Sequence, residues 1–508
     1  MRGSSNIKRL PALMLTMLVF CLLSACAGRN RTDGERNLNV FFEQVKQNEA
    51  MLVAFLHKMP KGADLHSHPS GAVYGEDFVD RTIEQGLYFD LRTKRFVPKP
   101  VRADPDRYYS PADLQLKFNK YGQVLDILAM RDMDKQPESG HDHFFMTWER
   151  YGKVDFPDAE QVVKVVHRAR MQKIGYVELM LAPAWKDGKI DPQGSKTRFA
   201  EINGAVRRYL AARQADDIEV GYTLSLSRTA TPPVTPDQRL DEAAYEAYFR
   251  PQVRGILELV RDNADLGLRG VTILAPEDAW VARVMFDTQM KIFNEEWRRL
   301  GDDPKARPRL NLHGGELTLE YSPYESMLTR ISDTVRLGHA SRIGHGVSIM
   351  WEDDVFGLLK SMKEQGIAVE ICLTSNAGIL NVVGGKRHPF RLYWEAGVPV
   401  VLCTDDEGIS RSNLTMEYAR AANWFNLSYA DMKKLSFDSL EYSFLSGASL
   451  FAGGNYSRQR AQDDPALAGS AKARAQARLL REFEDFETTM QNTVKLFGAT
   501  ERNKFNMR

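Results

Sequence analysis

The 508-residue sequence is poor in cysteine and has almost no net charge. It holds four cysteines, and its 68 basic residues nearly balance 67 acidic ones, for a formal charge of +1. Basic residues form only short runs such as Arg207-Arg208, so the concentrated cationic face that nucleic-acid binding needs is absent. Only Cys372 and Cys403 lie beyond the amino-terminal segment, which excludes a disulfide framework. Both stand in apolar runs, and we expect buried thiols; a disulfide between them is the alternative in an oxidising compartment.

The first 25 residues resemble an export signal rather than part of the fold. Basic residues precede an apolar run over 10–25, which is too short to span a membrane comfortably. The tetrapeptide LSAC, ending at Cys26, resembles a bacterial lipobox, which implies a lipid on Cys26 and attachment to a membrane. Because no Asp follows Cys26, we expect the periplasmic side of the outer membrane. The alternative is an ordinary secretory signal and a soluble periplasmic or secreted protein.

The rest of the chain is expected to form one folded body over 41–508. Residues 26–40 are polar and lack periodicity, which predicts a flexible tether. Apolar residues spaced by three and four over 41–59 predict an amphipathic helix, which Pro60 and Gly62 end. No internal sequence repeat is evident.

Eight short apolar runs, separated by helical patterns, predict an α/β barrel. Their positions are 63–68, 175–183, 218–228, 269–278, 309–316, 342–347, 367–376 and 398–408. Because the runs are continuously apolar, we expect strands buried on both faces and joined in parallel by helices. Eight such units predict a TIM (β/α)8 barrel, and a doubly wound open sheet is the alternative.

Two further regions must be accommodated outside the eight units. Residues 69–174, between the first two runs, are too many for one crossover, so we expect inserted helices there, one of them near 144–154. The charged, periodic tail over 473–497 predicts carboxy-terminal helices packed outside the barrel.

Polar side chains gather where the predicted strands end, which is where barrels place their function. They are His66, His68, Arg228, His313, Glu316, His345, Ser375, Asn376, Asp405 and Asp406. Imidazoles and a carboxylate that converge on one face are suitable ligands for a zinc-like ion. A second H-x-H pair, His141 and His143, lies in the long insert away from any strand end, and we interpret it as structural.

Four of these motifs, in this order, resemble those of the adenosine deaminase family of metal-dependent hydrolases. They are DLHSH at the first strand, LHGGE at the fifth, RIGHG at the sixth and TDD at the eighth. The resemblance covers about 59–450, and the helix before the barrel and the long insert look like the secreted, growth-factor-related branch. The other type of zinc deaminase needs a P-C-x-x-C motif, which this chain lacks.

The resemblance implies a role for each matched residue in the hydrolytic deamination of a purine nucleoside. Zinc would be held by His66, His68, His313 and Asp405. Glu316 would donate a proton to the purine ring and His345 would help to deprotonate and orient the attacking water, so that Glu316, His345 and Asp405 form the catalytic group. Asp406 would bind a second ring nitrogen. Zinc can lower the pKa of a bound water from about 15.7 to about 7.

Two positions depart from the family pattern, and both concern the substrate. The family commonly has an Asp that contacts the ribose where this chain has Ser70, and a glycine whose N–H contacts the purine where it has Pro276, which has no N–H. We therefore expect adenosine or a related purine nucleoside as substrate. The alternatives are a related hydrolase acting on another amino-heterocycle or an amide, and a non-catalytic binding lipoprotein.

Overall fold

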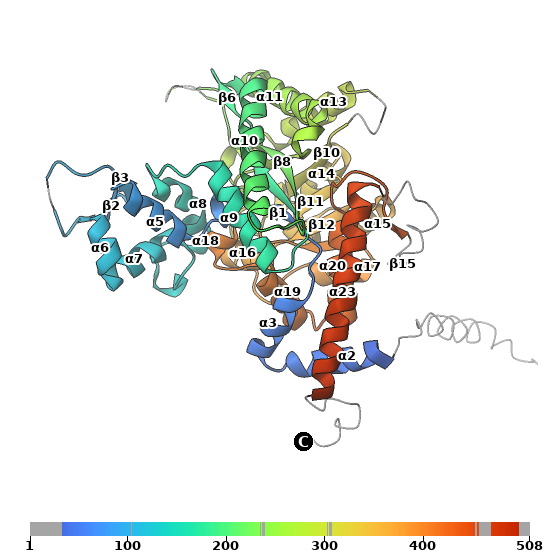
Figure 1. The fold of residues 1–508 in the computed structure, drawn as a ribbon. Coiled ribbons are helices and arrows are strands. Elements are labelled where there is room, and N and C mark those ends of the chain that lie inside the picture. Colours follow the sequence, from blue (N-terminus) through green and yellow to red (C-terminus); the bar gives the residue numbers. More distant parts are fainter. Residues whose placement is uncertain are drawn as a thin grey trace, which may run out of the picture.

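Eight parallel strands close into a barrel at the centre of the molecule (Figure 1). The computed structural model describes residues 33–102, 104–233, 235, 239–301, 303, 307–452, 455–456 and 469–496. In sheet order the strands are β1 Ala63–Ser67, β5 Tyr176–Leu181, β8 Glu219–Ser227, β9 Leu268–Leu274, β10 Arg309–Gly314, β11 Arg342–His345, β12 Ala368–Ile371 and β13 Val400–Leu402. A parallel bridge between Ser67 and Asp405 brings the last strand beside the first. The eight predicted strands and the barrel are confirmed, and the open sheet is ruled out.

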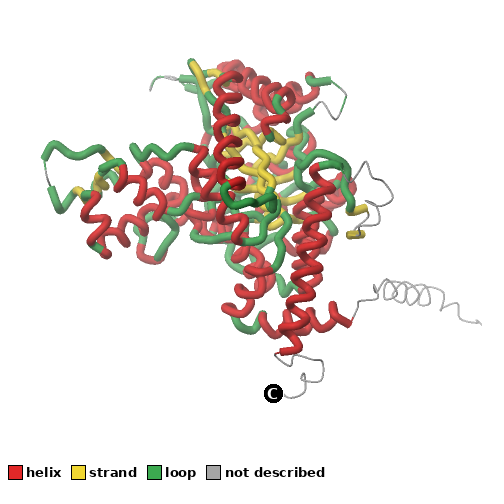
Figure 2. The backbone as a smooth tube through the Cα atoms, in the orientation of Figure 1, coloured by secondary structure: helices red, strands yellow, loops and turns green. Residues whose placement is uncertain are grey.

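Helices surround the barrel, as Figure 2 shows by the red segments around the yellow strands. They include α9 Asp158–Met171, α10 Pro192–Ala211, α11 Glu242–Asp262, α13 Phe286–Arg299, α14 Arg330–Arg336, α15 Val355–Gln365, α17 Phe390–Ala396, α19 Leu414–Trp424 and α20 Tyr429–Glu441. Local sequence fixes their starts: at α10, the Asp191 side chain accepts the amides of Gln193 and Gly194, and Pro192 occupies the first turn. Strands β1 and β5 are buried along their whole length, as continuous apolar runs predict.

Short elements complete the loops between strands and helices. They are β6 Trp185–Lys186, β7 Lys189–Ile190, η2 Ala264–Leu266, α12 Trp280–Val284, η3 Tyr324–Ser326, η4 Val347–Trp351, α16 Leu373–Leu380, α18 Glu407–Ser410, β14 Phe451–Ala452 and β15 Asn455–Tyr456. Ser375 and Asn376 therefore lie in a helix after β12 and not in the strand itself. Cys372 and Cys403 are buried free thiols, as expected.

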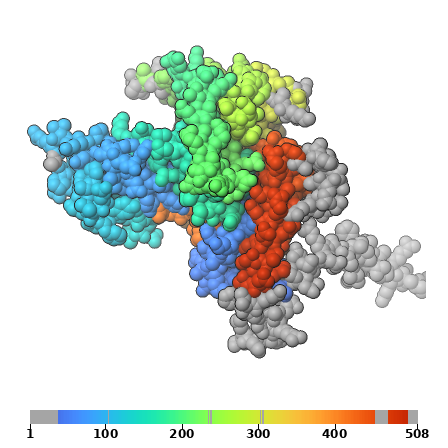
Figure 3. All heavy atoms as spheres, viewed as in Figure 1, coloured from blue at the N-terminus to red at the C-terminus, as the bar shows by residue number. Residues whose placement is uncertain are grey.

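The insert after β1 forms a lobe with its own core, which projects from the barrel in Figure 3 as the blue and teal surface. Its elements are α4 Pro69–Ala72, α5 Gly75–Glu84, β2 Tyr88–Asp90, β3 Arg95–Val97, β4 Tyr108–Tyr109, α6 Pro111–Leu116, α7 Phe118–Leu128, η1 Met133–Lys135 and α8 Gly140–Tyr151. Phe78, Phe89 and Phe96 belong to its separate apolar cluster. A third cluster joins Phe144 of α8 to Ile379 and Ile409 of the barrel loops, so α8 lies against the barrel.

The amino-terminal region differs from the prediction in two respects. The expected single helix over 41–59 is two helices, α2 Asp33–Val45 and α3 Glu49–Lys58, because the Asn48 side chain caps a new helix by accepting the Met51 amide. The tether prediction is wrong for 33–40, which is helical. This segment is mostly polar but presents one apolar face, and Leu38 on that face is buried in the main core. Residues 1–32, with the expected signal and Cys26, lie outside the described residues.

At the other end, the predicted terminal helices are one long helix, α23 Ala471–Leu496, which packs against α2 and α20 (Figure 1). Its buried side chains include Leu479 and Phe483. In the part of the chain that the structure describes, no helix combines the length and the apolar character needed to cross a membrane.

Candidate active site

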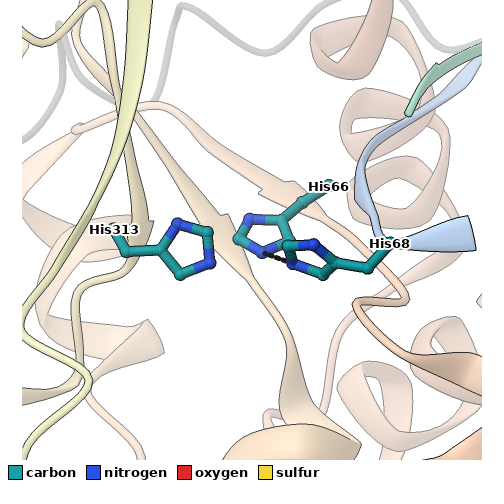
Figure 4. A group of neighbouring side chains, drawn as sticks. All are labelled: His66, His68 and His313. Carbon is teal, nitrogen blue, oxygen red and sulfur yellow. Dashed lines mark hydrogen bonds between the residues drawn. The ribbon is translucent and has the colours of Figure 1, made fainter. Parts of the chain in front are cut away.

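Three histidines from two strand ends point toward one another at the carboxyl end of the barrel (Figure 4). His66 is in β1, His68 follows it, and His313 is in β10. The nitrogens Nε2 of His66 and His68 lie 3.3 Å apart, and Asp405 Oδ1 lies 3.5 and 3.2 Å from them. Ligand atoms of His66, His68 and His313 lie within 4.8 Å of one another. Ligands of a tetrahedral zinc ion, at about 2.0–2.2 Å from it, stand roughly 3.3–3.6 Å apart, so the spacing of the His66, His68 and Asp405 atoms fits such an ion.

Each of three ligand candidates has an outer partner that fixes its orientation. His66 Nδ1 lies 2.7 Å from Glu370 Oε2, and His313 Nδ1 lies 3.2 Å from Thr272 Oγ1. Ser375 Oγ donates to Asp405 Oδ2 at 2.6 Å. Contacts of this kind leave Nε2 of the two imidazoles and one carboxylate oxygen free to face a cation.

A buried charge network supports this arrangement from inside the barrel. Arg342 donates to Glu370 Oε1 from Nε and to Glu178 Oε2 from Nη2, each at 2.5 Å, and all three side chains are at most 1% exposed. Burial opposes ionisation of Glu370, but Arg342 and His66 lower its pKa to about 2. Burial likewise opposes a charge on His66, yet Asp405 and Glu370 raise its pKa to about 10. The two carboxylates therefore favour a positive charge on the His66 ring itself.

The backbone is unusual at the same strand ends. His345, at the end of β11, has a φ of 66°, and Asp405, after β13, has a φ of 59°. Ala275, after β9, has a φ of 89°. Left-handed backbone is uncommon outside glycine and costs energy, and such residues concentrate at functional sites. Both His345 and Asp405 line the cavity at this end of the barrel.

The group faces a cavity of about 550 Å³, a volume suited to a small molecule. Among its lining residues are His68, His313, Glu316, His345, Asp405 and Asp406. Glu316 Oε1 and Asp406 Oδ1 are buried and have no hydrogen-bond partner among the described residues. Burial and the nearby charge of Asp405 raise the pKa of both carboxyl groups well above the ordinary range. Two carboxyl groups are thus available to donate hydrogen bonds into the cavity.

A chain of polar contacts determines which nitrogen of His345 carries the proton. The Phe390 amide donates to His388 Nδ1 at 3.1 Å, and His388 Nε2 donates to Asn376 Oδ1 at 3.2 Å. Asn376 Nδ2 then donates to His345 Nδ1 at 3.0 Å. Burial lowers the pKa of His345 to about 4, so its ring is neutral near pH 7 and its proton sits on Nε2.

Comparison with known proteins agrees with this geometry. A family model described as adenosine deaminase matches residues 248–449, which include His313, Glu316, His345, Asp405 and Asp406. This segment, about two fifths of the chain, is therefore similar to adenosine deaminases. His66, His68 and Ser70 lie outside the matched segment, and the barrel closure brings them to it.

Individual relatives match over limited lengths. An adenosine deaminase of Enterococcus faecalis is 36% identical over 137 residues, which are 27% of this chain and 37% of the relative. The human N6-methyl-AMP deaminase is 31% identical over 145 residues, 28% of this chain and 39% of that protein. The matches thus span less than half the length of these relatives. The structure of an adenine deaminase of Arthrobacter aurescens, 16% identical, superposes with a TM-score of 0.50 over 84% of this chain and 99% of that one, which is a likeness of fold.

Both departures from the adenosine deaminase pattern line the cavity. Ser70, in α4, accepts a hydrogen bond from Trp148 Nε1 of α8 at 3.0 Å. Pro276 follows the strained Ala275 and presents no backbone N–H. The insert therefore contributes directly to the site, through Trp148 and through Phe144, which also lines the cavity.

The second H-x-H pair lies in α8, away from this group. His143 is buried and contacts Glu138 Oε1 at 3.1 Å and the Ala129 carbonyl at 3.0 Å. His141 stacks on Tyr321 and contacts Asp278 Oδ1 at 3.2 Å. These contacts agree with a structural role for the pair.

Sequence reasoning missed the supporting residues Glu178, Glu370 and Trp148. One signal was available for the two glutamates: each is a lone acid within an otherwise apolar buried strand, and a buried charge needs a partner. Trp148 had no such signal, because only the packing of α8 on the barrel places it in the cavity.

Proposed function

We propose that this protein is a metal-dependent hydrolase that deaminates adenosine or a related purine nucleoside, giving an inosine-type product and ammonia. The observation that carries the proposal is the convergence of three imidazoles, one carboxylate and the buried carboxyl group of Glu316 on one cavity of about 550 Å³. A binding protein would have no need for a buried carboxyl oxygen that has no hydrogen-bond partner among the described residues beside a set of metal ligands.

Zinc is the ion we propose, held by His66, His68, His313 and Asp405. Neutral imidazole and carboxylate suit it, and the 3.2–3.5 Å separations among the ligand atoms of His66, His68 and Asp405 match its tetrahedral geometry, with a ligand atom of His313 within 4.8 Å of those of the other two histidines. Burial, together with repulsion from His66, lowers the pKa of His313 well below its ordinary value, which keeps its ring neutral. When bound, such an ion supplies Lewis acidity that makes a water molecule acidic near neutral pH.

The chain's own groups account for the remaining proton positions. Water adds to the carbon that bears the amino group, and charge develops on the adjacent ring nitrogen. Glu316, kept protonated by burial, donates its proton to that nitrogen, which the addition requires. Asp406 holds a second ring nitrogen. The proton that the water releases restores the Glu316 carboxyl group, and the hydroxyl proton of the adduct passes to the amino group. The carbon–nitrogen bond then breaks as the carbon–oxygen double bond forms, and the amino group leaves as ammonia.

His345 would orient the attacking water through the proton on Nε2. Acceptance of a proton at that nitrogen requires the opposite tautomer, and therefore a reversed Asn376 amide and a changed His388 ring. The hydrogen-bond chain thus supports the orienting part of the role expected for His345, and it disfavours proton removal by that nitrogen.

The substrate is expected to differ in its contacts from that of an ordinary adenosine deaminase. Ser70 is shorter than an aspartate, and its oxygen is already engaged by Trp148, while Pro276 has no N–H for the purine. The matched relatives include an N6-methyl-AMP deaminase as well as adenosine deaminases. These departures favour a purine whose sugar side packs against the aromatic rings that line the cavity, among them Phe144 and Trp148.

The test combines metal analysis with an ammonia-release screen on the full chain. We expect about one zinc per chain and release of ammonia from adenosine or 2′-deoxyadenosine. The screen also includes adenine, AMP and cytidine, and N6-methyl-AMP is followed by release of methylamine, its leaving group. Activity on cytidine alone would overturn the purine assignment. Glu316→Gln should abolish turnover and keep the metal. Glu352→Gln, a buried glutamate that does not line the cavity, is the matched control and should retain turnover.

We also propose that the chain is a lipoprotein anchored through Cys26 on the periplasmic side of the outer membrane. The LSAC tetrapeptide and the absence of Asp after Cys26 support this. Labelled palmitate should be incorporated into the expressed chain and lost in Cys26→Ser. An unlabelled, fully soluble wild-type chain would refute the anchor.

A further inference from the structure

Glu277, directly after Pro276, holds the turn that carries Glu316. Its two carboxylate oxygens accept two consecutive backbone amides: Oε2 accepts the N–H of Gly315 at 3.1 Å, and Oε1 accepts the N–H of Glu316 at 3.0 Å. The Glu277 side chain is fully buried. A carboxylate that bridges adjacent amides fixes both the position and the direction of the peptide between them.

Two buried arginines hold this carboxylate in place. Arg228 Nη1 lies 3.1 Å and Arg330 Nε lies 3.6 Å from Glu277 Oε2, and both side chains are 1% exposed. Arg228 also donates to the carbonyl of His313 at 2.6 Å, so the same cluster touches the candidate metal ligand through its backbone. Burial opposes ionisation of Glu277, but the two arginines and the two amides lower its pKa below the ordinary value.

The opposite side of the turn is fixed by backbone contacts from β11 and the residues after it. The amide of Gly346 donates to the Gly314 carbonyl at 3.2 Å, and the amide of Ser348 donates to the Gly315 carbonyl at 2.9 Å. Gly315 has a φ of 84°, and a Cβ there would lie 2.7 Å from Ser348 Oγ. The turn therefore tolerates only glycine at this position, and Glu277 supplies its anchor on the β9 side.

We propose that Glu277 is a positioning residue for the deamination: through the amides of Gly315 and Glu316, it aims the Glu316 carboxyl group into the cavity. The expected effect of Glu277 on kcat rests on the proposed function. The anchoring of the turn by Glu277 rests only on the contacts described above. Glu277 does not line the cavity and touches no reacting atom.

The test is Glu277→Gln, which keeps the shape and removes one acceptor. The new –NH2 group then faces a backbone N–H or an arginine, so the turn loses one of its two anchors. We expect kcat to fall on the order of 10²-fold, as a displacement of about 1 Å at a reacting group can cause. KM and the zinc content should change little, because the substrate and metal contacts remain. Glu277→Asp keeps both acceptors and the charge, and should recover part of kcat.

Glu352 offers a matched control. It too is a buried glutamate that accepts two consecutive amides, those of Ile331 and Ser332 at 2.5 and 3.3 Å, but it anchors the start of α14. Glu352→Gln should retain kcat. An equal loss of kcat in both variants would show a general structural effect and overturn the positioning role, as would an unchanged kcat in Glu277→Gln.

Hydrogen–deuterium exchange separates this inference from the proposed function. The amides of Gly315 and Glu316 should exchange faster in Glu277→Gln than in the wild type, while the rest of β10 keeps its protection. Unchanged exchange would overturn the anchor even if the enzyme is active. If the wild type deaminates no purine, the proposed function fails, and faster exchange still establishes that Glu277 fixes the turn. If Glu277→Gln does not fold, amide exchange and kcat are measured on Glu277→Asp instead. Exchange rates and a kcat equal to those of the wild type would then refute the positioning role.

Discussion

Replacement of Glu370 by glutamine tests whether a charge inside the barrel controls the metal site. Glu370 accepts from Arg342 through Oε1 and contacts His66 Nδ1 through Oε2, and none of the three side chains is more than 1% exposed. A glutamine can satisfy only one of these partners. If its –NH2 group faces His66, it donates to Nδ1 and forces the ring proton onto Nε2, the nitrogen that should face the metal. If it faces Arg342, two donors oppose each other.

The size of the effect follows from the role of such outer partners. Their loss typically weakens metal binding 10–100-fold, or about 1.4–2.8 kcal/mol. Removal of one partner from a buried ion pair also destabilises the fold by about 3–5 kcal/mol, and we expect the lower end because Glu178 still neutralises Arg342. The two effects are measurable separately, by competition with a chelator and by urea unfolding of the metal-free protein.

Glu178→Gln is the matched control for this prediction. Glu178 pairs with the same arginine and accepts the Phe444 amide at 2.5 Å, but it does not contact His66. Both variants should lose similar stability, and only Glu370→Gln should bind zinc more weakly. Unchanged zinc affinity in Glu370→Gln, or an equal loss in both, would refute the tautomer argument.

Two further predictions concern residues outside the catalytic group. Burial raises the pKa of Glu352 to about 6, so the folded state binds more protons than the unfolded state between about pH 4.5 and 6; its contribution is present at low pH and is lost as the pH rises through 6. This fall in unfolding free energy amounts to at most about 2 kcal/mol, and Glu352→Gln should flatten it. An unchanged pH profile in that variant would show that Glu352 does not cause the fall. His143→Phe leaves Glu138 and the Ala129 carbonyl without their ring partner, and should cost about 1–3 kcal/mol in urea unfolding with zinc content unchanged. Loss of zinc would contradict the structural role of His143.

The amino-acid pattern predicted the barrel because its strands are buried on both faces and their apolar runs are continuous. It failed at the amino terminus, where 33–40 looked too polar for a helix. One apolar residue per turn is enough when a neighbouring helix covers it, and Leu38 is covered in the main core. Helix boundaries inside the insert were likewise beyond prediction, because its separate core depends on contacts between distant segments.

By itself, the sequence determined which residues reach the carboxyl end of the barrel, since side chains at the ends of parallel strands must meet there. The order of the strands and the positions of polar residues at their ends are enough to bring His66, His313 and Asp405 together. They could not supply Glu277, which acts through a turn nearly 40 residues away, or Glu370, whose partner His66 lies on another strand. Nor could they bring Trp148 to Ser70. Those contacts depend on barrel closure and on the docking of α8, which only the tertiary structure decides.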